Sequence, residues 1–213
     1  MKKIKYLIAI VSILLTQFSY AQNQDAKKIL DATASAFNKA GGVTAQFTVK
    51  TTVASKEQGQ LSGTMQLKGN KFKITTPTTT TWFDGKTQWS YVRDNEEVNI
   101  STPSKSEIAK MNPYSFVNIY KSGYSYAMGS TKTLRGHSTH EVVLTANAKG
   151  KNADKIIITV DKNTYEPLCI RVKQGKSWNT IIIKSFAKGQ KFSDATFKFN
   201  KNEYPKAELI DLR

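Results

Sequence analysis

The sequence predicts a mainly β (α+β) protein, an incomplete and strongly curved antiparallel β-barrel whose apolar face is covered by helices. Two observations lead to this fold class. After residue 42, about ten successive segments alternate apolar and polar residues, the pattern of strands with one dry and one wet face. An amphipathic helix precedes them and a shorter one interrupts them. A meander of this size curves into one large sheet, and the helices are suited to cover its concave apolar face.

The N-terminus has the three-part pattern of a secretory signal peptide. Lys2, Lys3 and Lys5 form a basic start, residues 6–15 are almost wholly apolar, and Ser19 and Ala21 are small residues where a signal peptidase would cut. An uncleaved membrane anchor is the alternative, but a span needs about 20 apolar residues. We therefore expect residues 1–21 to be a cleavable signal peptide, residues 22–213 to form one domain, and the protein to be periplasmic.

Charge and cysteine content restrict the partners. Removal of residues 1–21 takes away three lysines and no acidic residue, which lowers the formal net charge from +16 to +13. Export argues against nucleic acid, so we expect an anionic membrane surface or an acidic protein as partner, with simple solubility as the alternative. The one cysteine, Cys169, is far from the cleavage site, so the sequence predicts a released protein without a lipid anchor or internal disulfide.

The first helix is expected to begin with Asp25 as its N-cap and to end at Gly41 and Gly42. Its apolar positions recur at helical spacing: Ala26, Ile29, Leu30, Thr33, Phe37 and Ala40. Only one side of the helix is apolar, so we expect it to lie on another element.

The first strands are expected at residues 43–53, 60–68 and 72–74, with turns at 56–59 and 69–70. A hairpin over residues 79–84 and 86–92 is indicated by Asp84-Gly85, and residues 98–100 continue the sheet. Residues 103–111 read as a loop, and Asn112-Pro113 is expected to begin a short helix. Six later strands are expected, at residues 124–128, 141–146, 155–161, 167–174, 178–188 and 192–200.

The residues that usually carry catalysis are scarce. His137 and His140 lie in what reads as a turn entering a strand, and no carboxylate or cysteine pattern near them completes a metal site. Cys169 is best read as a packed strand residue and Glu96-Glu97 as a solvated corner. We expect neither an enzyme, nor a cofactor, nor a bound metal.

Large apolar side chains collect on the strands of the first half: Phe47, Met65, Leu67, Phe72, Trp82, Trp89 and Tyr91. The simplest interpretation is a core beneath the helices. A second is a lining that admits alkyl chains, since burial contributes about 0.8 kcal/mol per methylene.

Several segments resemble, in order along the chain, the family of the periplasmic lipoprotein carrier LolA. They are Gly63-Thr64-Met65-Gln66-Leu67-Lys68, the hairpin from Phe83 to Tyr91 with its Asp-Gly-Lys, Trp and Tyr, the segment Asn112-Pro113-Tyr114-Ser115-Phe116, and the stretch from Asp194 to Phe199. The resemblance covers essentially the whole chain after residue 21. It implies helices that act as a lid over a hydrophobic cavity, and no catalysis.

The resemblance also implies a binding site for acyl chains. Phe37, Tyr114 and Val117 would face the cavity mouth, and Phe47, Met65, Trp89 and Tyr91 would lie on the sheet side, with Leu67 and Phe72 beside them. Family members use an Arg after the second strand to hold the lid, and here Gly69 is nearest to that position. Lys68 and Lys71 are the candidate replacements, although lysine lacks the planar guanidinium fork.

By this resemblance the protein would be a Gram-negative periplasmic chaperone that binds the acyl chains of lipoproteins and carries them toward the outer membrane. It would act as a monomer between an inner-membrane ABC-type release complex and an outer-membrane receptor or membrane surface. The alternatives are a periplasmic carrier or sensor of free lipids or glycolipids on the same half-barrel and, less consistent with the residues, a hydrolase or isomerase.

Overall fold

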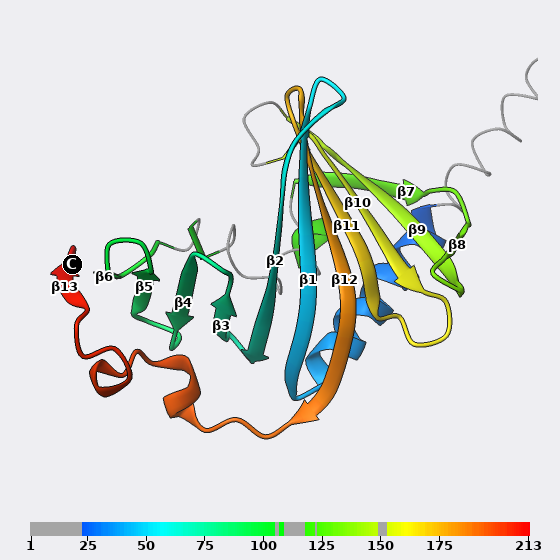
Figure 1. Ribbon diagram of the computed structural model, residues 1–213. Coiled ribbons are helices and arrows are strands. Elements are labelled where there is room, and N and C mark those ends of the chain that lie inside the picture. Colours follow the sequence, from blue (N-terminus) through cyan, green and yellow to red (C-terminus); the bar gives the residue numbers. More distant parts are fainter. Residues whose placement is uncertain (1–22, 105–106, 109–117, 122, 149–152) are drawn as a thin grey trace, which may run out of the picture.

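The computed structural model describes residues 23–104, 107–108, 118–121, 123–148 and 153–213 (Figure 1). The expected signal peptide lies outside these residues, and so do residues 112–117 of the expected second helix; its last apolar residue, Tyr120, lies in a 3-10 helix at Ile119–Lys121. Within the described residues, no helix is both long enough and apolar enough to cross a membrane.

One large sheet dominates the structure. Its strands are β1 (Gly42–Val53), β2 (Lys56–Lys68), β3 (Lys71–Thr75), β4 (Thr79–Phe83), β5 (Gln88–Val92), β6 (Glu97–Ser101), β7 (Tyr124–Met128), β8 (Thr133–Leu134), β9 (His137–Ala146), β10 (Lys155–Asp161), β11 (Pro167–Gln174), β12 (Ser177–Gln190) and β13 (Glu208–Asp211). The described residues also form three short 3-10 helices, η1 (Ile119–Lys121), η2 (Asp194–Phe197) and η3 (Lys201–Glu203).

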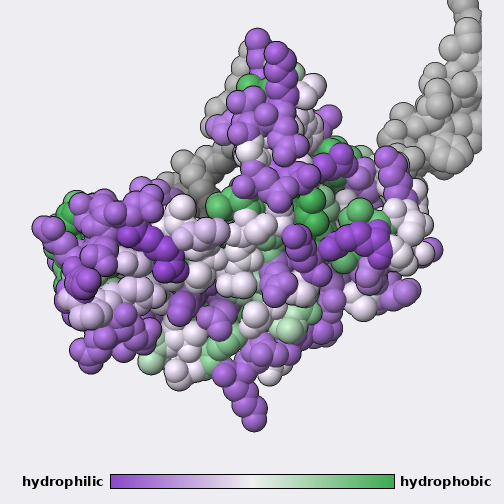
Figure 2. Space-filling model, viewed as in Figure 1, coloured by the Kyte–Doolittle hydropathy of each residue, from purple (hydrophilic) through white to green (hydrophobic). Residues whose placement is uncertain are grey.

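The strand order is β13-β6-β5-β4-β3-β2-β1-β12-β11-β10-β9-β7, with β8 paired to β9 outside this path. Because β13 and β7 stand at opposite ends of the order, the sheet curves without closing (Figure 1). The two halves of the chain meet where β1 pairs antiparallel with β12. The β1–β2 and β11–β12 hairpins extend together beyond the other strands, and hydrophilic residues cover this tip in the view of Figure 2.

The N-terminal helix spans residues 23–39 and lies across the face of the sheet that we call the helix face. Its predicted apolar stripe is confirmed: Ala26, Ile29, Leu30, Thr33, Phe37 and Ala40 are all buried. The predicted N-cap is wrong, because Asp25 already lies inside the helix. The helix ends as expected, since Gly41 has φ +68°, a left-handed conformation that glycine adopts without strain.

Several expected segments differ from the structure. His137 and His140, expected in a turn, both belong to β9. Residues 56–59 belong to β2, because the turn comes earlier, at Ala54 and Ser55, which both have positive φ. Residues 192–200 form no strand; η2 occupies Asp194–Phe197. A helical turn here brings the rings of Phe192 and Phe197 together, with centroids 5.7 Å apart, whereas a strand would point them to opposite sides.

The C-terminal segment, residues 191–213, packs on β4 to β6 on the outer face, the side of the sheet opposite the helix. Phe199 and Tyr204 both pack edge-on against Trp82, at centroid distances of 5.7 and 5.5 Å. The segment then adds β13 beside β6 in a parallel pair, which the sequence did not predict. Both faces of β4 are therefore dry: Trp82 is buried on the outer face and Phe83 on the helix face.

Candidate functional site

The helix face carries two apolar clusters, one under each half of the N-terminal helix. The first joins Ala26, Ile29 and Leu30 of the helix to strands β7, β9, β10 and β11. Its strand residues are Tyr124, Val142, Leu144, Ile156, Ile158, Val160 and Ile170. This cluster holds the first half of the helix on the second half of the sheet.

The second cluster lies under the last turn of the helix, and it brings together five of the predicted binding residues. Phe37, Phe47, Met65, Leu67 and Phe72 belong to it, and each is 0–8% exposed. Strand register explains the grouping, because Leu67 pairs directly with Phe72 and so points to the same side of the sheet. We call this group the Phe47 cluster.

Gly63 allows the Phe47 cluster to pack closely. It pairs with Phe47 across β1 and β2. A Cβ at Gly63 would come within 2.8 Å of the Phe47 ring and 2.5 Å of the Thr75 carbonyl oxygen. Only glycine lets the Phe47 ring lie over β2 while β3 remains in place.

Val43, Phe83 and Ile183 also belong to the Phe47 cluster, although the sequence reasoning did not select them as binding residues. The alternating pattern of β1 was sufficient to place Val43 on the same face as Phe47. Ile183 was harder to assign, because Ile181-Ile182-Ile183 is a continuous apolar run that gives no indication of which residue faces inward.

Trp89 and Tyr91 lie apart from the other predicted binding residues. Trp89 pairs with Trp82, and Tyr91 pairs with Thr80, which places both aromatic side chains on the outer face. There they pack with Val98, Ile100, Phe199 and Tyr204. They therefore contact β6 and the C-terminal segment.

The remaining predicted residues concern the lid. Tyr114 and Val117 lie outside the described residues. Lys71 pairs with Asp194 at 2.9 Å, and Lys68 donates to the Phe192 carbonyl at 2.8 Å and lies 3.5 Å from Asp194. These contacts, the Lys71 hydrogen bond first, lower the pKa of Asp194. Both lysines thus tie the β2–β3 turn to the C-terminal segment.

A hydrogen bond that the sequence did not suggest fastens the helix to η1. The Tyr120 hydroxyl donates to Asp31 Oδ1 at 2.5 Å, and Lys27 pairs with Asp31 Oδ2 at 2.6 Å. Burial, followed by the hydrogen bond to Asp31, raises the pKa of Tyr120. The hydrogen bonds from Lys27 and then Tyr120 lower the pKa of Asp31.

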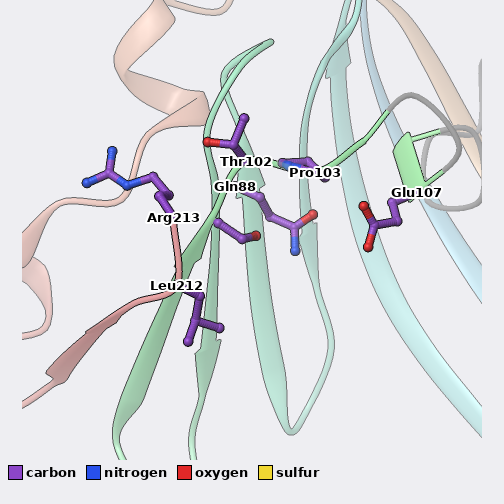
Figure 3. A pocket seen from close by; sticks show the side chains of 7 residues that line it. Gln88, Thr102, Pro103, Glu107, Leu212 and Arg213 are labelled. Atoms are coloured by element: carbon purple, nitrogen blue, oxygen red, sulfur yellow. The ribbon is translucent and has the colours of Figure 1, made fainter.

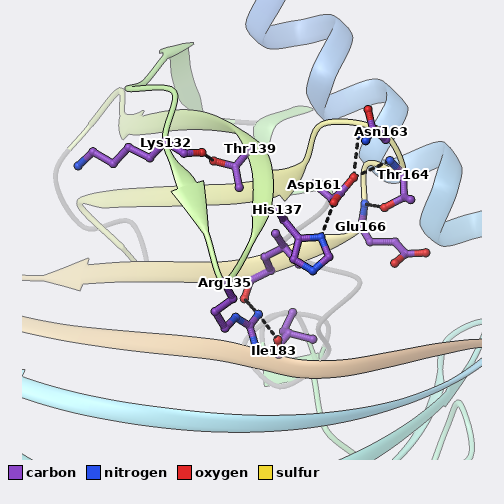
Figure 4. A network of polar contacts seen from close by, with 10 residues as sticks. Lys132, Arg135, His137, Thr139, Asp161, Asn163, Thr164, Glu166 and Ile183 are labelled. Atoms are coloured by element: carbon purple, nitrogen blue, oxygen red, sulfur yellow. Dashed lines mark hydrogen bonds and ion pairs between the residues drawn. The ribbon is translucent and has the colours of Figure 1, made fainter.

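His137 belongs to a polar network around the β8–β9 hairpin (Figure 4), whereas His140 stacks on the Tyr165 ring at a centroid distance of 6.3 Å. His137 Nδ1 lies 2.7 Å from Asp161 Oδ2, and Asp161 Oδ1 accepts from the backbone N–H groups of Asn163 and Thr164. Arg135 reaches across to β12, where its guanidinium donates to the Ile183 carbonyl at 2.5 Å. These bonds fix turns and strand edges. In the part of the chain that the structure describes, no group of three His, Cys, Asp or Glu residues is placed to hold a metal ion.

Comparison with known proteins gives a family match and several matches of fold. A sequence model described as outer membrane lipoprotein carrier protein LolA matches residues 15–176. No curated protein matches the chain.

An uncharacterized conserved protein from Thermus thermophilus has a similar structure, with a TM-score of 0.60 and 14% identity over 88% of this chain and 99% of that one. The lipoprotein LppX of Mycobacterium tuberculosis has a TM-score of 0.50 and 12% identity, over 78% of this chain and 99% of LppX. LprF from Mycobacterium bovis also has a TM-score of 0.50, with 10% identity over 80% of this chain and 96% of LprF. These similarities confirm the predicted fold class.

Proposed function

The chain belongs to the LolA family of outer membrane lipoprotein carrier proteins, and from this membership we propose that it binds the acyl chains of lipoproteins on its helix face and carries them toward the outer membrane. The observation that carries the proposal is the Phe47 cluster. It is a continuous apolar surface on the concave side of an open sheet, covered by one turn of a helix. Proteins of this family are carriers or binding proteins, and we propose a mechanism in which no covalent bond is made or broken.

Binding requires the cover to move, because the side chains of the Phe47 cluster are nearly inaccessible. The cover contributes Phe37 and Ala40 to the cluster, while Ala26, Ile29 and Leu30 pack elsewhere on the sheet. Displacement of the last helical turn therefore leaves the first apolar cluster intact. Gly41 follows this turn and supplies a backbone position that tolerates large φ changes.

The partners and the location follow from the same proposal. We propose that residues 1–21 are removed on export to the periplasm, where the protein accepts cargo from an inner-membrane ABC-type complex and delivers it to an outer-membrane receptor or membrane surface. The net charge of +13 after removal of residues 1–21 favours encounter with anionic lipid surfaces. Lys68 and Lys71 stay our candidates for lid control, through their position beside the β2–β3 turn.

The test is native mass spectrometry of the purified protein with a triacylated lipoprotein. We expect a one-to-one complex with the wild type and none with Phe47→Glu, since a carboxylate on the helix face is incompatible with bound acyl chains. Gln46→Glu is the matched control, because it places the same charge one residue away on an exposed position of β1.

Phe47 is buried, so Phe47→Glu will also destabilise the fold. Val49→Glu serves as a second variant: Val49 borders the Phe47 cluster and is only half-buried. Lipoprotein binding by a folded Val49→Glu protein at wild-type affinity would contradict the proposed site. Co-purified free lipids without lipoprotein binding would identify the protein as a carrier of free lipids or glycolipids instead.

A further inference from the structure

The helix face changes from apolar to polar along two rows of paired residues. The first row crosses β1 to β6 through Val43, Leu67, Phe72, Phe83, Gln88 and Ser101. The second crosses the same strands through Ala45, Met65, Ile74, Thr81, Ser90 and Asn99. Directly paired residues point to the same side, and neighbouring strands lie about 4.8 Å apart. On this face, the apolar side chains of β1 to β3 are therefore followed, further along the sheet, by polar side chains on β5 and β6.

A cavity of about 620 Å³ opens at the polar end of the first row. It is lined by Gln88, Ser101, Thr102, Pro103, Glu107, Leu212 and Arg213 (Figure 3). Ile108, the neighbour of Glu107, packs against the Phe47 cluster. The cavity and the apolar cluster are therefore adjacent both along the sheet, through Phe83 and Gln88, and through residues 107–108.

Gln88 has a polar atom with unused bonding capacity. Its Nε2 donates to Ser90 Oγ at 3.2 Å, and its Oε1 is buried without a hydrogen-bond partner among the described residues. If the side-chain amide were rotated by half a turn, Nε2 and Oε1 would exchange places, and Nε2 would then be the atom without a partner. A buried acceptor without a partner is unfavourable, and a ligand that donates a hydrogen bond to it would remove this cost.

The charged groups of the cavity already have partners. The Arg213 guanidinium lies 2.5 Å from Asp211 Oδ2. Glu107 Oε2 accepts from the backbone N–H and the hydroxyl of Ser104, at 2.8 and 2.7 Å. With these charges paired, the cavity is better suited to a neutral group that donates hydrogen bonds than to a phosphate.

We propose that this cavity is a head-group subsite: it holds the neutral, donor-bearing part of an acylated ligand, an amide N–H or a hydroxyl, while the acyl chains lie on the Phe47 cluster. The subsite rests on the proposed function, since it needs acyl chains on the neighbouring surface. Gln88 is the acceptor of the head group, through a side-chain rotation that brings the buried Oε1 to the cavity surface. Ser101 and Thr102 supply hydroxyls beside it.

The test compares three probes that share palmitoyl chains, by competition with a fluorescent palmitoyl probe. A triacylated cysteinyl lipopeptide offers amide N–H groups, monopalmitoylglycerol offers hydroxyls, and methyl palmitate offers no donor. Gln88→Met keeps the length of the side chain and removes the acceptor. Gln60→Met, at an exposed position of β2, is the matched control.

We expect Gln88→Met to weaken binding of the lipopeptide, the monoacylglycerol or both by about three- to tenfold, the range for loss of one hydrogen bond, and to leave methyl palmitate within about twofold. A loss confined to one donor probe identifies that donor as the head group. An equal loss for all three probes, or no loss for any, would overturn the subsite. If the wild type binds none of the probes, the proposed acyl-chain function itself fails.

Folding gives an independent check. Gln88→Met removes the unpaired Oε1 together with the hydrogen bond from Nε2 to Ser90 Oγ, so the urea midpoint should fall by no more than the loss of one part-buried hydrogen bond allows. A larger drop of the midpoint would mean that Gln88 holds the fold together and would count against its assignment to a ligand.

Discussion

Tyr120→Phe tests how the helix is held on the sheet. The Tyr120 hydroxyl donates to Asp31 Oδ1 at 2.5 Å, and it joins η1 to the N-terminal helix. The substitution removes one oxygen atom and leaves the ring in the first apolar cluster, where Tyr120 is 5% exposed. Any loss of stability should therefore come from the hydrogen bond alone.

The magnitude follows from the surroundings of the two groups. A hydrogen bond to a charged acceptor contributes about 1.5–3 kcal/mol when buried. The Asp31 side chain is 47% exposed, and solvent screening reduces this contribution. We expect Tyr120→Phe to lower the free energy of unfolding by about 1 kcal/mol at pH 8. A double-mutant cycle with Asp31→Asn should assign most of this loss to the pair.

The pH dependence gives a sharper signature. The pKa of Tyr120 is raised above its ordinary value of 10.0 in the folded protein, by burial first and by Asp31 second. The phenol therefore ionises in the unfolded chain before it ionises in the folded one. Its stabilising contribution is complete below pH 10 and is lost as the pH rises toward the folded pKa. At pH 10.5 the loss amounts to about 0.8 kcal/mol.

The assay is urea unfolding followed by tryptophan fluorescence at pH 8 and pH 10.5. Other tyrosines titrate alike in both proteins, so the difference between wild type and Tyr120→Phe isolates Tyr120. We expect this difference to shrink at the higher pH. A difference that stays constant would refute the assignment of Tyr120 as a protonated, hydrogen-bonded phenol in the folded state.

Two further substitutions probe the two faces of the sheet. Gly63→Ala should lower the free energy of unfolding by about 1–3 kcal/mol, because the new methyl group meets the Phe47 ring and the Thr75 carbonyl. Urea unfolding measures this change, and an unchanged midpoint would contradict the close packing around Gly63. Trp82→Ala should lower the free energy of unfolding by about 3–5 kcal/mol, because it removes the ring against which Phe199 and Tyr204 pack. Lipopeptide affinity should stay unchanged in the folded protein, and weakened binding would mean that Trp82 takes part in binding.

The strands could be predicted where alternation and turn chemistry coincide. The expected segments 124–128, 155–161 and 167–174 match β7, β10 and β11 residue for residue. The C-terminal region could not be predicted in this way. β13 has no alternating apolar pattern and pairs in parallel with β6, more than one hundred residues earlier. That pairing becomes favourable only once the folded sheet presents β6 as an edge strand.

The predicted binding residues of β1 to β3 lie together on the helix face, and those of β5 lie on the outer face, for a reason of register. A shift of one residue moves every side chain of a strand to the other face. In β4, Trp82 and Phe83 are both large and both buried, so its sequence does not show which one faces the helix. The pairs Phe72–Phe83 and Phe83–Gln88 settle it: Gln88 faces the helix, and Trp89 faces the C-terminal segment.

Under the proposed function, reversible carriage would depend on how the Phe47 cluster is covered. An acyl chain that enters must displace apolar side chains that are already buried, Phe37 at 5% and Ala40 at 6% exposure. Burial of the chain contributes about 0.8 kcal/mol per methylene, while exposing the Phe37 side chain costs about 1.5–3 kcal/mol. The first few methylenes therefore only offset the opening, and each later one adds affinity. Under the proposed function, long acyl chains bind and short ones do not, and the closing helix lowers the cost of release to a receptor.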